Sequence, residues 1–164
     1  MDNIIKCSLE TLQKSKKLLL SLNSESLSNA SISPYYSSIG SHLRHVYDFY
    51  NCLLNNGNEG VIDLTIRKRD LSVETCCDSA IGYLDDITLK LKSLKYEANT
   101  LVKVIDDLGY GNVEINYTYP ALLAQANSHT IHHYAIIGYI LDRLNIEFLD
   151  DDFGYNPTTP KKTK

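Results

Sequence analysis

Four segments of this chain repeat apolar residues at steps of three and four, and this spacing constrains the fold more than any other feature. The clearest repeat runs without a break through Cys77, Ala80, Leu84, Ile87, Leu91 and Leu94. The other three begin at Ile5, Ile39 and Leu122. Such spacing puts each set on one stripe of a helix, and each stripe has to be buried against another helix.

The repeats and their flanking residues predict where the helices begin and end. We expect helices over residues 3–22, 34–56, 72–95 and 119–145. Proline tolerates the first turn of a helix, which fits Pro34 and Pro120, and Ser72 is a suitable N-cap. Gly57 is expected to end the second helix.

The connecting segments complete an all-α prediction. Residues 58–71 are expected to run extended over the surface, and residues 99–117 to form two short strands around a glycine-rich turn. Residues 146–164 have no periodicity and predict an irregular tail. The chain is therefore predicted to be one domain over residues 1–164, an up-down four-helix bundle with a small β-hairpin before the last helix.

Charge and hydropathy exclude several classes of partner. The chain has 16 basic and 20 acidic residues and a net charge of −4, the opposite of what neutralising nucleic-acid phosphates requires. No apolar run approaches the roughly 18 residues that cross a bilayer, and the N-terminus lacks the pattern of a signal peptide. We expect a cytoplasmic protein that acts on a small molecule, without nucleic-acid or membrane partners.

All five histidines fall in two short windows, which contain His42, His45, His129, His132 and His133. Residues four apart on a helix point the same way, so His129 and His133 converge as a pair of ligands for a divalent metal ion. Both also occupy core-facing positions, where an unpartnered imidazole costs about 1–3 kcal/mol. Metal binding would remove that cost. His132 lies on a different side of the helix from His129 and His133, so it need not be a ligand.

A third ligand from the second helix would give three protein ligands and one open position, the arrangement of catalytic metal sites. Helical phase slightly favours His42 over His45, and periodicity leaves the choice open. The competing interpretation is that the histidines are core residues hydrogen-bonded to tyrosines. The nearest tyrosines in the sequence are Tyr47, Tyr50 and Tyr134.

Two segments resemble the histidine motifs of the DinB/YfiT-like superfamily. They are residues 37–48, which contain His42-Leu43-Arg44-His45-Val46-Tyr47-Asp48, and residues 127–134, Asn-Ser-His-Thr-Ile-His-His-Tyr. The resemblance implies a four-helix bundle whose divalent metal is held by one histidine of the second helix and a His-x-x-x-His pair of the fourth. In that family, the histidine ligand of the second helix is followed by a hydrophobic residue, a variable residue and an aspartate. The segment His45-Val46-Tyr47-Asp48 matches this pattern, so the resemblance selects His45.

With ligands His45, His129 and His133, the resemblance leaves His42 as a residue of the pocket or one that supports the ligands. Asp48 would then orient an imidazole N–H or lie in solvent. His132 and Asp48 are candidate bases only by proximity, so no catalytic residue is assigned.

Three neutral histidines leave Zn²⁺ or Ni²⁺ with most of its charge, so the ion acidifies bound water or binds a thiol as thiolate. Members of the resembled superfamily include transferases and isomerases that use low-molecular-weight thiols, and others described only as metal hydrolases. We therefore expect a metal-dependent hydrolase or thiol-dependent S-transferase. The alternative is a non-catalytic bundle that binds a metal or another ligand, haem included.

Two surface features are left open by the sequence. The segments 58–71 and 106–118 are expected to shape the pocket, and Arg67-Lys68-Arg69 would meet an anionic cofactor there or form a solvated basic run, the simpler interpretation. We also expect a homodimer through an exposed helix face, although no distinct patch marks that face.

Overall fold

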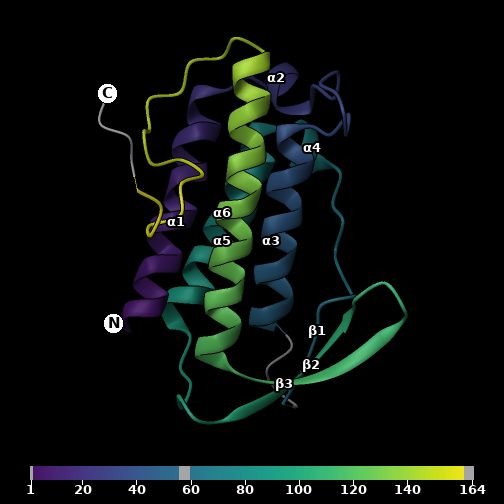
Figure 1. Ribbon diagram of the computed structural model, residues 1–164, viewed down its shortest axis with the longest axis vertical. Coiled ribbons are helices and arrows are strands. Elements are labelled where there is room, and N and C mark those ends of the chain that lie inside the picture. Colours follow the sequence, from purple (N-terminus) through teal and green to yellow (C-terminus); the bar gives the residue numbers. More distant parts are fainter. Residues whose placement is uncertain (1, 56–59, 161–164) are drawn as a thin grey trace.

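The computed structural model describes residues 2–55 and 60–160. Four long helices lie side by side in it (Figure 1): α1 (Asn3–Ser21), α3 (Ile39–Asn55), α5 (Cys77–Ser93) and α6 (Tyr119–Arg143). The short helices α2 (Ser24–Ser28) and α4 (Ser72–Thr75) lie at one end of the molecule, and the strands β1 (Val61–Asp63), β2 (Leu101–Asp107) and β3 (Asn112–Thr118) lie at the other.

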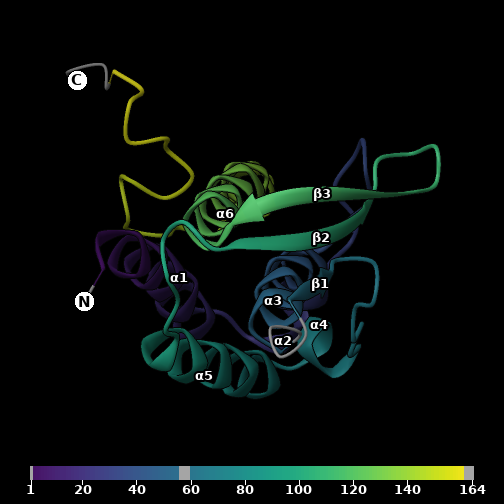
Figure 2. The same ribbon diagram turned by 90° about the horizontal axis from the view of Figure 1, so that it is seen from below.

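The long helices enclose the core because their apolar stripes face one another. Both α1 and α3 pack against α5 and α6, as the end-on view of Figure 2 shows. The predicted stripe of α5 is confirmed, since Ala80, Leu84, Ile87 and Leu91 are all buried. Leu12, Leu43 and Ile137 meet them in the core with at most 1% of their surface exposed.

A three-stranded mixed sheet closes one end of the helices, and it overturns the predicted all-α four-helix bundle. In the described residues there are six helices and three strands, with β1 parallel to β2 and β2 antiparallel to β3. The expected hairpin is β2–β3. The segment expected to lie over the surface instead supplies β1, because Ile62 and Leu64 alternate into the core and are buried.

Two helix boundaries also differ from the predictions. The second long helix begins at Ile39 and not at residue 34, since residues 33–36 form a turn; its predicted end at residues 56–57 lies outside the described residues. The predicted helix 72–95 is broken at Cys76, whose backbone is extended, into α4 and α5. The break lets α4 lie against α3, where a Cβ on Gly40 would come within 2.1 Å of the Glu74 carbonyl oxygen.

The described part of the tail, residues 146–160, has no helix or strand and lies over α1 and α6. The Lys14 ammonium lies 3.5 Å from the Asp150 carboxylate. The Phe153 ring stacks on the Tyr134 ring, with 4.5 Å between the ring centroids. Gly154 has a φ of +76°, and a Cβ there would clash with the Ala135 backbone at 2.7 Å. Residues 161–164 of the predicted tail lie outside the described residues.

Among the described residues, no helix combines the length and the apolar character needed to cross a bilayer.

Candidate metal centre

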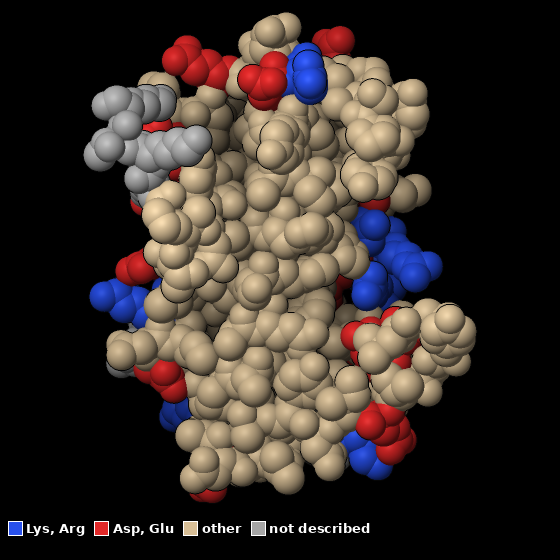
Figure 3. All heavy atoms as spheres, viewed as in Figure 1, with Lys and Arg blue, Asp and Glu red and all other residues tan. Residues whose placement is uncertain are grey.

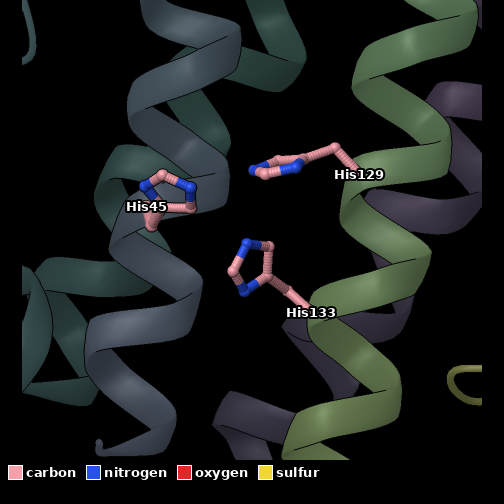
Figure 4. Close-up of side chains that lie close together, drawn as sticks. All are labelled: His45, His129 and His133. Carbon is pink, nitrogen blue, oxygen red and sulfur yellow. The ribbon is translucent and has the colours of Figure 1, made fainter. Parts of the chain in front are cut away.

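Three histidines face one another across the contact between α3 and α6 (Figure 4). His45 comes from the middle of α3, and His129 and His133 come from adjacent turns of α6. One ring nitrogen of each lies within 4.8 Å of the others, and all three side chains are half-buried. The structure therefore brings together the three residues that the resemblance selected.

Hydrogen bonds engage Nδ1 of two of the three rings. Nδ1 of His45 accepts a hydrogen bond from Arg67, and Nδ1 of His133 lies 2.8 Å from Nδ1 of His42. Nε2 of His129 is buried and has no hydrogen-bond partner among the described residues. Figure 4 shows one nitrogen of each ring aimed into the shared space between the helices.

This donor set fits a metal ion. The nitrogens of a tetrahedral zinc site lie about 3.3 Å apart, so the rings would have to approach by at most about 1.5 Å, within reach of small side-chain rotations. Metal coordination would also give the buried Nε2 of His129 the partner that it lacks. The three-histidine group can hold a metal ion.

The site favours neutral imidazoles, whose lone pairs are available to an ion. Burial, the nearby Arg67 guanidinium and His129 together lower the pKa of His45 to about 4. Burial and the surrounding histidines lower the pKa of His133 to about 3. The pKa of His129 is also lowered, first by burial and then by His132 and Arg67, so all three rings are uncharged at neutral pH.

His42 supports the group without joining it. Its Nδ1 meets Nδ1 of His133, and its Nε2 lies 2.8 Å from the Ser37 hydroxyl. If Nδ1–H of His133 donates to His42 and Nε2–H of His42 donates to Ser37, the lone pair of His133 is directed at the centre. Such hydrogen bonds fix the tautomer and the orientation of a metal-binding histidine.

Asp48 lies one turn beyond His45 but is turned away from the histidines. It is fully buried and accepts hydrogen bonds from the Arg44 guanidinium at 2.7 Å, the Tyr83 hydroxyl at 3.0 Å and the Arg69 backbone N–H at 3.2 Å. No hydrogen bond in the described residues joins it to an imidazole. Asp48 therefore anchors the segment between β1 and α4 and does not orient a histidine.

The remaining sequence candidates lie outside the group. His132 is exposed, and its ring lies 5.3 Å from the His133 ring without a hydrogen bond in the described part of the chain. The tyrosine interpretation finds no support, because the Tyr47 hydroxyl donates to Ser15 and the Tyr134 hydroxyl donates to the Thr11 carbonyl oxygen. No hydrogen bond in the described residues joins the buried Tyr50 hydroxyl to an imidazole.

Sequence reasoning missed the contact of Arg67 with this site, although the basic run was visible. Its Nη1 donates to Nδ1 of His45 at 3.1 Å, and its Nε donates to the Leu64 carbonyl oxygen at 3.0 Å. Arginine only donates hydrogen bonds, so Nδ1 of His45 is the acceptor and the proton of the neutral ring is on Nε2. An ion on Nε2 would move that proton to Nδ1, and Arg67 would then have to turn away.

No family model matches this chain, and comparisons with curated proteins and with solved structures find no match either. What the site does is therefore inferred from its own residues.

Proposed function

We propose that the chain binds one divalent metal ion through Nε2 of His45, His129 and His133 and is a metal-dependent enzyme acting on a small molecule. The observation that carries the proposal is the convergence of three neutral imidazoles on one point, where Nε2 of His129 is buried without a partner. A polar atom in that state is costly unless something binds it. The resemblance of both histidine segments to the DinB/YfiT-like motifs agrees with this ligand set.

Three uncharged ligands leave an ion with its full formal charge, so it would supply Lewis-acid activation of water or of a low-molecular-weight thiol. Imidazole nitrogens suit zinc and nickel, the two ions that we propose. The chain's own residues hold the site in shape. His42 and Ser37 orient His133, and the buried Phe49 ring packs 5.4 Å from the ring of His129.

Metal analysis of the native protein tests the proposal. Elemental analysis should find about one zinc or nickel per chain in the wild type and in His132→Ala, the matched control on the exposed face of α6. His129→Ala should have lost the ion. Equal metal content in His129→Ala and the wild type would contradict the proposed site.

Turnover of electrophilic substrates then separates the two reactions. Activity that requires an added thiol supports the S-transferase, and activity without a thiol supports the hydrolase. Activity that survives in His129→Ala would count against a metal mechanism. One bound ion without turnover of either kind would favour the non-catalytic alternative.

A further inference from the structure

Beside the histidine group lies a cleft of about 420 Å³, lined by two arginines, Arg67 and Arg69, and two aspartates, Asp106 and Asp107. Arg67 belongs to both places, since it lines the cleft and contacts His45. Figure 3 shows Lys and Arg side chains (blue) projecting at the edge of the molecule, beside the segment that links β1 to α4 in Figure 1. The cleft thus opens next to the candidate metal centre.

The cleft carries both signs of charge, but in the described residues its two arginines form no ion pair with a carboxylate. Nη2 of Arg67 has no hydrogen-bond partner there. Hydrogen bonds from the hairpin backbone hold the two aspartate carboxylates in place. Asp107 accepts from the N–H groups of Gly109 and Gly111, and Asp106 accepts from the N–H of Asp107.

The segment that carries the arginines, residues 64–70 (the arginine loop), is held at three points. The Leu64 N–H donates to the Ile105 carbonyl oxygen, the Cys52 thiol donates to the Ile66 carbonyl oxygen, and the Arg69 N–H donates to buried Asp48. A loop fixed in this way needs no further ordering of its backbone when a ligand binds. The fold therefore fixes the backbone position of Arg67.

We propose that Arg67 is the anion-binding residue of the site and that the substrate carries a carboxylate or a phosphate group. This inference rests on the proposed function. An ion on Nε2 of His45 would put a proton on Nδ1 and break the hydrogen bond from Arg67, so the guanidinium would be free to serve the cleft that it already lines. There its planar fork pairs two N–H groups with two oxygens of an anion.

Anion binding to Co²⁺-loaded protein tests this, with the visible spectrum of the ion as the readout. The probes are acetate, inorganic phosphate and acetamide, the last being the uncharged analogue of acetate. The wild type should bind one Co²⁺ and respond saturably to at least one of the two anions but not to acetamide. Arg67→Gln should keep the Co²⁺ and raise the dissociation constant of that anion by at least about 10-fold. The anion that saturates at lower concentration identifies which group the site prefers.

Lys68→Gln is the matched control, because it removes the same charge from the neighbouring residue, which lies outside the cleft and is 60% exposed. It should bind the anions as the wild type does. Arg67→Lys, which keeps the charge but loses the fork, should bind them with intermediate affinity. The proposal is overturned if Arg67→Gln binds like the wild type, or if Lys68→Gln weakens binding equally.

A separate readout keeps this inference distinct from the proposed function. If the wild type binds no Co²⁺, the proposed function has failed, and phosphate is titrated into the metal-free protein while the NMR signal of Arg67 Nε–H is followed. A saturable shift of that signal, absent on titration with sodium chloride, would support Arg67 as an anion site. An unchanged signal would overturn it.

Discussion

Replacing His129 with leucine is expected to change stability in opposite directions with and without metal. In the metal-free wild type, Nε2 of His129 is buried without a hydrogen bond, a state that costs about 1–3 kcal/mol. Leucine has a similar volume and no polar atom. In a chelator, His129→Leu should therefore be more stable than the wild type by about 1 kcal/mol, or 2–4 °C in Tm for a chain of this size.

Zinc should reverse this order. An ion that binds only the folded state at 100 times its dissociation constant stabilises the wild type by about 2.7 kcal/mol, and the variant should gain nothing. Thermal unfolding followed by circular dichroism, in EDTA and in zinc, measures both effects. The control is His132→Leu, which makes the same change on the exposed face of the same helix. The reasoning is refuted if zinc stabilises His129→Leu as much as the wild type, or if the variant is the less stable protein in EDTA.

Three further predictions concern the surroundings of the site. Asp48→Asn should lower the free energy of unfolding in urea by about 2 kcal/mol, because the Arg44 guanidinium loses its buried carboxylate and keeps only Glu74; a loss below about 0.5 kcal/mol would contradict this. Gly154→Ala should speed proteolysis within residues 146–160, since its Cβ would clash with the Ala135 backbone; an unchanged rate would show that the tail tolerates it. The metal-free protein should lose stability as pH falls from about 6.5 toward 4. The pKa of His45 is lowered from its ordinary 6.5 to about 4, so the unfolded chain takes up the proton first. Urea midpoints should therefore depend less on pH in His45→Leu than in the wild type, and equal slopes would argue against a buried neutral His45.

The parts of the fold that sequence could predict are those specified by nearby residues. A stripe of apolar residues is a local property, so the four long helices were predictable, and the β2–β3 turn was marked by Gly109 and Gly111. The strand β1 was not, because its partner β2 lies far along the chain and three residues make a weak pattern. The break at Cys76 depends on the close approach of α4 to Gly40, which is also a long-range contact.

In the candidate site, too, some residues could be predicted from local sequence and others depend on contacts between distant segments. The spacing of His129 and His133 follows from helix geometry alone, but helical phase favoured His42, and only the resemblance selected His45. In the structure His42 does meet the group, one turn away and through His133. The position of Arg67 depends on how the arginine loop is anchored to Asp48 and Ile105, and no local pattern contains that information.

The candidate ligands join two helices that are separated along the chain by β1, α4, α5 and the hairpin. An ion shared by α3 and α6 would therefore cross-link distant parts of the chain, and neither helix could open locally without releasing it. Amide hydrogen exchange should slow in both helices together when the ion binds. The turn of the hairpin, which the cross-link does not include, should continue to exchange at its own rate.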